Sequence, residues 1–148
     1  MIAALKALFE APAKETREAL RHRLQLASAV LLIETARADF SENSSEQEAL
    51  EQLLCGTLKL ESDEIHALVE LATERLDSAT SLYEFTRLIN DHYQPQEKLQ
   101  LIHNMWVVAW ADGDIDKYEE HLIRRVADLI YVSHQDFIRR KHAAQKQA

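Results

Sequence analysis

The chain has little of what β-sheet proteins and disulfide-stabilised proteins require. It contains two glycines, two prolines and one cysteine in 148 residues. Tight turns between strands depend on glycine and proline, so their scarcity favours helices joined by short links. A single cysteine, Cys55, cannot form an internal disulfide. Its apolar neighbours predict a small core residue rather than a redox site.

A basic excess and a long apolar run are also missing. The chain has 17 Lys and Arg against 25 Asp and Glu, a net charge of −8. Nonspecific nucleic-acid binding depends on Lys and Arg that neutralise phosphates, so no nucleic-acid partner is expected. The chain has no apolar window of about 18 residues, so no membrane span is predicted. The start lacks the pattern of a cleaved signal peptide, and the expected location is cytoplasmic.

The charge is unevenly distributed along the chain. Residues 39–51 carry five acidic side chains and no Lys or Arg, whereas the end is basic, with Arg139, Arg140, Lys141 and Lys146. The length fits one domain, taken as residues 1–148. Within it, residues 1–12 are expected to hold a short docking helix that Pro12 ends, and residues 143–148 a frayed tail.

Apolar residues recur at helical spacing almost throughout. Helices are expected over about 14–39, from Ser44 or Ser45 to Gly56, from about residue 61, over about 82–92 after a break at 78–81, and over about 96–111 and 116–130, with a last helix that starts at Ser133. The helix over 96–111 is apolar nearly all round, which is typical of a central helix. The predicted fold class is all-α, a single-domain orthogonal bundle of about seven helices.

The two halves of the chain resemble each other. A shift of 73 positions places Ala38-Asp39 on Ala111-Asp112, Glu46 on Glu119 and Leu50 on Ile123. Each half then has a helix, an Ala-Asp pair, an acidic loop and a helix that carries a glutamate. The sequence therefore predicts a pseudo-repeat of helix hairpins.

The stretch AWADGDID, residues 109–116, concentrates carboxylates at the end of the apolar helix. Carboxylate oxygens are the ligands that Ca²⁺ and Mg²⁺ prefer. An EF-hand is excluded, because Lys117 and Ile123 stand where that loop needs glycine and glutamate. A looser and weaker cation site remains, with candidate ligands from this loop and from its counterpart in the first half: Asp112, Asp114, Asp116, Glu119, Glu120, Asp39 and Glu46.

A structural role for the same carboxylates stays open beside the cation site. Asp114 or Asp116 can cap the next helix, and Glu119 and Glu120 suit its positive end. Three aspartates in five residues exceed what capping needs, so capping alone does not explain the loop. Elsewhere the sequence has no glycine-rich phosphate loop, nucleophile elbow or cysteine pair, and no enzyme activity is expected.

The stretch AWADGDIDKYEEHLIRRVADLIYVSHQDFI, residues 109–138, resembles the tellurite-resistance TerB-like family. This all-helical group also supplies the N-terminal region of some membrane-anchored DnaJ-type co-chaperones. The likeness is closest over residues 105–142, and residues 24–71 look like the family's degenerate repeat, in which Phe40 replaces the glycine. The resemblance implies a role in tellurite or chemical stress and a metal site at Asp112, Asp114, Asp116 and Glu119, with Asp39 and Glu46 as counterparts.

Together these features predict a non-enzymatic stress-response module that binds a divalent cation weakly through its acidic loops. The alternative is a protein-interaction or co-chaperone-type adaptor whose acidic face docks a basic partner. A protein partner is expected in either case, and the sequence leaves both a monomer and a homo-oligomer open.

Overall fold

The computed structural model describes residues 16–37, 50–52, 54–56, 61, 63–67, 79–111 and 113–146. Throughout these ranges the regular structure is helical, which confirms the all-α class. Five long helices account for most of it: α2 (Arg17–Arg37), α5 (Ala79–His92), α6 (Pro95–Trp110), α7 (Lys117–Leu129) and α8 (His134–Gln145). Shorter helical pieces lie at 50–52, 54–56 and 63–67.

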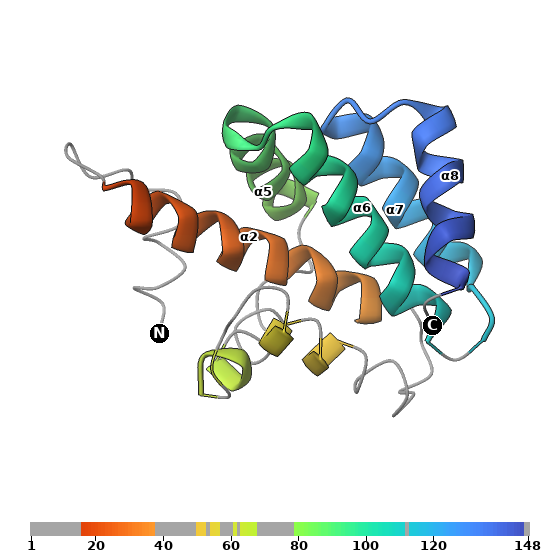
Figure 1. Cartoon of the computed structure of the whole chain (residues 1–148), viewed down its shortest axis with the longest axis horizontal. Coiled ribbons are helices and arrows are strands. Elements are labelled where there is room, and N and C mark those ends of the chain that lie inside the picture. Colours follow the sequence, from red (N-terminus) through yellow and green to blue (C-terminus); the bar gives the residue numbers. More distant parts are fainter. Residues whose placement is uncertain are drawn as a thin grey trace.

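Helix α6 is the centre of the described bundle. It packs against α2, α7 and α8, and α2 also packs against α5 (Figure 1). The apolar side chains of Ile102, Met105, Trp106 and Val108 are fully buried, as expected for a helix that is apolar nearly all round. The prediction of a central helix over 96–111 is confirmed.

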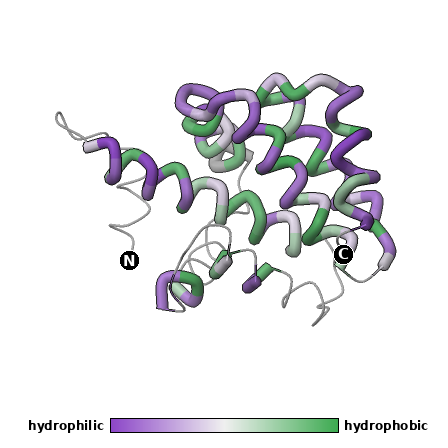
Figure 2. Tube along the Cα trace, in the orientation of Figure 1, coloured by the Kyte–Doolittle hydropathy of each residue, from purple (hydrophilic) through white to green (hydrophobic). Residues whose placement is uncertain are grey.

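The second half of α2 is a second buried helix, which the sequence reading missed. An apolar stripe was expected on one face, but every residue from Ala27 to Ile33 is buried, Ser28 included. In Figure 2 the hydropathy changes along α2, from largely hydrophilic at its start to more apolar further on. Helices α5, α6 and α7 pack against α2, and the exposed residues among those described in α2 lie in its first half.

Helix boundaries follow the local start signals at three of the expected places. Pro95 opens α6, Asp116 caps α7 and Ser133 caps α8, where the Ser133 Oγ accepts the Asp136 N–H at 3.2 Å. The break expected at 78–81 is wrong over its last three residues, because α5 already begins at Ala79.

The described residues allow one pair of positions from the predicted pseudo-repeat to be compared. Leu50 and Ile123, which the shift superimposes, are both buried.

The prediction for Cys55 is wrong, because this side chain is exposed. Leu50 and Leu54, four residues apart, take the buried face of their short helix, and the next residue is rotated away from it.

The two ends of the chain are covered only in part. The expected docking helix within residues 1–12 lies outside the described residues. Helix α8 continues to Gln145 with Ala144 buried, so residues 143–145 of the expected frayed tail are helical. None of the helices in the described ranges combines the length and the apolar character needed to cross a lipid bilayer.

Candidate functional site

The acidic loop joins α6 to α7 and is fixed at its start by a left-handed glycine. Gly113 has a φ of +87°, a conformation that is open to glycine and strained for other residues. Its N–H donates to the Trp110 carbonyl oxygen at 2.8 Å. This turn ends α6, and the chain continues through Asp114, whose side chain is exposed.

The end of the loop is fixed by a reciprocal capping box at the start of α7. The Asp116 Oδ1 accepts the N–H of Tyr118 at 2.8 Å, and the Asp116 N–H donates to the Glu119 Oε1 at 3.1 Å. Glu119 is fully buried. A capping box satisfies N–H groups that have no partner within the helix. Asp116 and Glu119 thus have the capping role that the sequence left open.

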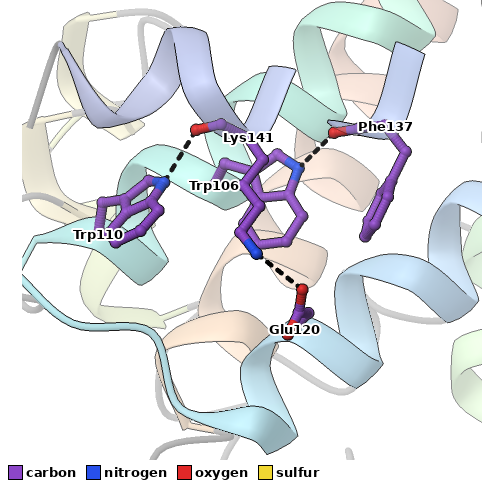
Figure 3. Close-up of polar contacts among 5 residues, drawn as sticks. All are labelled: Trp106, Trp110, Glu120, Phe137 and Lys141. Carbon is purple, nitrogen blue, oxygen red and sulfur yellow. Dashed lines mark hydrogen bonds and ion pairs between the residues drawn. The ribbon is translucent and has the colours of Figure 1, made fainter. Parts of the chain in front are cut away.

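Glu120 faces α8 and pairs with a partly buried lysine. The Lys141 Nζ lies 2.8 Å from the Glu120 Oε1 and 5.4 Å from the centre of the Trp106 ring (Figure 3). The Glu120 side chain is 33% exposed and the Lys141 side chain 23%, so this ion pair is shielded from water more than a typical surface pair. This ion pair joins the first turn of α7 to the middle of α8.

Two tryptophans of α6 complete the junction. The Nε1 of Trp106 donates to the Phe137 carbonyl oxygen at 3.2 Å, and the Nε1 of Trp110 donates to the Lys141 carbonyl oxygen at 2.9 Å (Figure 3). The two donors are four residues apart on α6, and the two acceptors are four residues apart on α8. One turn of α6 therefore lies along one turn of α8. The sequence predicted these tryptophans only as core residues, although their spacing already placed them on one face.

The structure brings only part of the predicted cation ligands into view. Asp112, Asp39 and Glu46 lie outside the described residues. Within the described ranges, no group of three or more His, Cys, Asp or Glu side chains is gathered closely enough to hold a metal ion. Asp114 and Asp116 follow each other in one loop, whereas Glu119 is buried behind it and Glu120 turns to Lys141. A cation site here therefore requires at least one of the three carboxylates that are not described.

Comparison with known protein families finds a match over most of the chain. The model of a family described as "Tellurite resistance protein TerB" matches residues 25–142. The matched range runs from the first half of α2 into α8 and includes both acidic segments. A comparison with curated proteins gives no match, and neither does a comparison with solved structures.

Proposed function

Because the chain belongs to the TerB family of tellurite resistance proteins, we propose that it is a non-enzymatic stress-response module that binds a divalent cation weakly. The ligands that we assign are Asp112, Asp114 and Asp116 of the loop between α6 and α7. Asp39 and Glu46 are their counterparts in the first half of the chain. Ca²⁺ and Mg²⁺ fit this set, because both prefer oxygen ligands.

The observation that supports this proposal is a carboxylate-rich loop fixed at both ends. The Gly113 turn and the Asp116 capping box are three residues apart, and Asp114 is exposed between them. A fixed loop loses less conformational entropy when it binds an ion than a mobile one. A carboxylate also has about four acceptor positions, so Asp116 keeps the capacity to bind a cation while it caps α7.

Glu119 and Glu120 have a different part in the proposal. The Glu119 carboxylate holds the Asp116 N–H, and Glu120 holds Lys141. We propose that both glutamates position the loop and the start of α7, and that the aspartates supply the oxygens that contact the cation.

A titration with Ca²⁺ or Mg²⁺ followed by amide NMR tests the proposal. We expect saturable shifts at Gly113 and Asp114 below about 10 mM metal, since the weakest protein calcium sites have millimolar dissociation constants. The Asp112→Asn variant should lose these shifts. The matched control is Asp128→Asn, which removes the same charge from an exposed position in the last turn of α7 and should keep them.

Two results would contradict the cation proposal. Spectra that stay flat over the whole titration would exclude binding at this loop. Equal losses in Asp112→Asn and Asp128→Asn would show that the metal responds only to the overall charge of the protein.

A second candidate function is the adaptor, in which an acidic face docks a basic partner. The exposed carboxylates of Glu51, Glu61 and Asp63 favour it, since they continue the acidic stretch that begins at Asp39. In that case a Glu46→Lys and Glu48→Lys double variant should lose capture of a defined basic partner and keep its melting temperature. Unchanged capture would remove the adaptor function from this stretch.

A further inference from the structure

The C-terminal hairpin of α7 and α8 has the opposite charge to the body of the protein. Residues 117–148 hold seven Lys and Arg and four Asp and Glu, a net charge of +3, whereas residues 1–116 hold 10 and 21, a net charge of −11. A positively charged surface on a protein that is negatively charged overall attracts negatively charged partners to that surface. The hairpin is therefore where an acidic ligand would be drawn.

Part of this positive charge has no ion-pair partner among the described residues. Lys141 is paired with Glu120, and Arg139 lies 3.9 Å from Asp136. Arg124 and Arg125 are both exposed, and neither forms an ion pair with any described residue. An arginine guanidinium can bind a carboxylate in a two-pronged geometry that lysine cannot offer.

Arg124 is also held in place by α8. Its guanidinium carbon lies 5.6 Å from the centre of the Phe137 ring, and the His134 ring stacks on the same phenyl ring at 5.9 Å. Phe137 itself is buried, so Arg124 and His134 together cover it at the junction of α7 and α8. A side chain that is already ordered loses less entropy on binding.

The connection between α7 and α8 adds an exposed aromatic side chain in a strained conformation. Tyr131 has a φ of +61° and is 81% exposed. The N–H of Val132 donates to the Ala127 carbonyl at 2.8 Å, and that of Tyr131 to the Asp128 carbonyl at 3.3 Å. These two hydrogen bonds form a turn that is common at the C-terminal end of helices. Its left-handed position, here Tyr131, is usually a glycine, because a side chain strains that backbone conformation. Strain kept at an exposed position indicates a function for the side chain.

We propose that Arg124, Arg125, Tyr131 and His134 form a docking surface for an acidic segment of a partner protein. Tyrosine and arginine are the residues that most often dominate binding energy at protein interfaces. The acidic side chains on the same hairpin leave the surface open, since Glu120 and Asp136 are engaged with Lys141 and Arg139. Asp128, which is also exposed, lies one turn beyond Arg124 on α7 and reduces the net positive charge of the hairpin.

The charge of the rest of the molecule favours a short acidic segment over a nucleic acid. A long polyanion would extend beyond the hairpin onto the rest of the chain, which has a net charge of −11, and would be repelled there. A short peptide segment fits within the hairpin and meets only its positive field. The docking surface is separate from the acidic loop and does not depend on cation binding.

Fluorescence anisotropy with a labelled polyglutamate peptide of about eight residues tests the docking surface in low salt, where such contacts are least screened. A neutral Gly-Ser peptide of the same length is the control ligand. We expect the wild-type protein to bind polyglutamate, and the Arg124→Glu and Arg125→Glu double variant to bind it about tenfold more weakly, as loss of charge-assisted hydrogen bonds predicts.

The matched control variant reverses Arg17 and Arg21, two exposed arginines in the first turns of α2. It changes the net charge by the same amount at the end of α2 that lies farthest from α8 in Figure 1. We expect it to bind polyglutamate within about twofold of wild type, since these contacts are short-ranged. An equal loss in both double variants would overturn the proposal, because binding would then follow overall charge.

Tyr131→Gly gives a second readout that a purely structural role would not produce. Glycine relaxes the left-handed turn, so the melting temperature should be unchanged or higher while peptide affinity falls. A Tyr131→Gly variant with wild-type affinity would overturn the role of this side chain.

Three further results would replace the acidic protein segment by another ligand and so overturn the proposal. The first is tighter binding of a single-stranded oligonucleotide through the same arginines. The second is tighter binding of phosphatidylserine vesicles. The third is self-association of the wild-type protein in low salt that the Arg124 and Arg125 reversals abolish, which would identify a second copy of the chain as the occupant.

Discussion

Tyr93 shows how a single polar group can join distant parts of the chain. Its hydroxyl lies 2.7 Å from the Ser28 Oγ and 3.5 Å from the Leu24 carbonyl oxygen, so the link between α5 and α6 is joined to α2. Burial raises the pKa of the Tyr93 phenol above its usual value of 10.0, the hydrogen bond with Ser28 acts in the opposite direction, and the nearby Glu97 adds to the increase. Folding therefore favours the neutral phenol.

The raised pKa of Tyr93 predicts a loss of stability in alkali. Above about pH 10, a tyrosine in the unfolded chain gives up its proton, whereas Tyr93 in the folded protein keeps it. The unfolded state then binds fewer protons, so the free energy of unfolding decreases as the pH increases. Below that pH both states are neutral and the contribution is fully present. Urea denaturation at about pH 8 and pH 10.5 measures the difference.

A matched comparison isolates Tyr93 from the other alkaline titrations. Tyr93→Phe should lose less stability than wild type between the two pH values, even though it is less stable at pH 8 because Ser28 loses its partner. Tyr83→Phe changes a tyrosine that is 57% exposed and should keep the wild-type dependence. Identical pH dependence in all three proteins would contradict a raised pKa at Tyr93.

Single residues were the hardest to assign from sequence. The capping role of Asp116 and Glu119 was one of two interpretations of the acidic loop, and the capping box now accounts for contacts of both. Exposure of Cys55 was missed, because apolar neighbours in sequence do not fix which side of a short helix a residue occupies. The strained Tyr131 was also missed, since nothing in local propensity places a tyrosine in the left-handed region.

Helix boundaries were predicted more accurately, since their signals are local. Pro95, Asp116 and Ser133 each stand at the start of a helix. Asp116 and Ser133 accept N–H groups of the first turn, and Pro95 lacks an N–H that would have no partner there. The residue before the start of α5, Ser78, lies outside the described residues, so the start signal of this helix is not compared.

The capping box of α7 can be tested by substitution at Asp116. Asp116→Ala removes the acceptor for the Tyr118 N–H and should reduce the free energy of unfolding by about 1 kcal/mol, as is typical for loss of an N-cap. Asp116→Asn keeps a capping oxygen and should stay within about 0.5 kcal/mol of wild type, because Asn and Asp cap almost equally well. Urea denaturation followed by circular dichroism measures both.

The two substitutions also separate capping from charge. Asn removes the negative charge and keeps the hydrogen bond, whereas Ala removes both. If Asp116→Asn is destabilised as much as Asp116→Ala, the contribution of Asp116 is electrostatic and the capping box is not its source.

At the scale of the whole molecule, the sequence predicted the class of fold but not which helices meet. Periodicity identified helices and the apolar character of α6, since both are properties of one segment. The indole contacts of Trp106 and Trp110 with α8 bridge 31 residues, and the buried run of α2 depends on three neighbouring helices. Such contacts are fixed by packing between segments, to which composition and spacing give no direct access.

Phe137 is the residue through which the C-terminal helices hold together. It is buried, and its ring centre lies 4.9 Å from that of Trp106 on α6. The guanidinium of Arg124 on α7 also lies against the Phe137 ring. The Phe137 carbonyl oxygen also accepts the Trp106 indole. One side chain of α8 thus contacts both of the helices against which α8 packs.

Phe137→Ala should therefore destabilise the whole bundle rather than α8 alone. Removing a buried phenyl ring costs about 3–5 kcal/mol, a large part of the 5–15 kcal/mol that typically stabilises a domain. Both tryptophans of the chain are on α6 and contact α8, so intrinsic fluorescence during urea denaturation reports whether α8 stays docked. The control is Gln135→Ala, at an exposed position of α8, which should unfold as wild type does. A loss below about 1 kcal/mol for Phe137→Ala, with unchanged fluorescence, would show that α8 is held on α6 by the indole and Lys141 contacts instead.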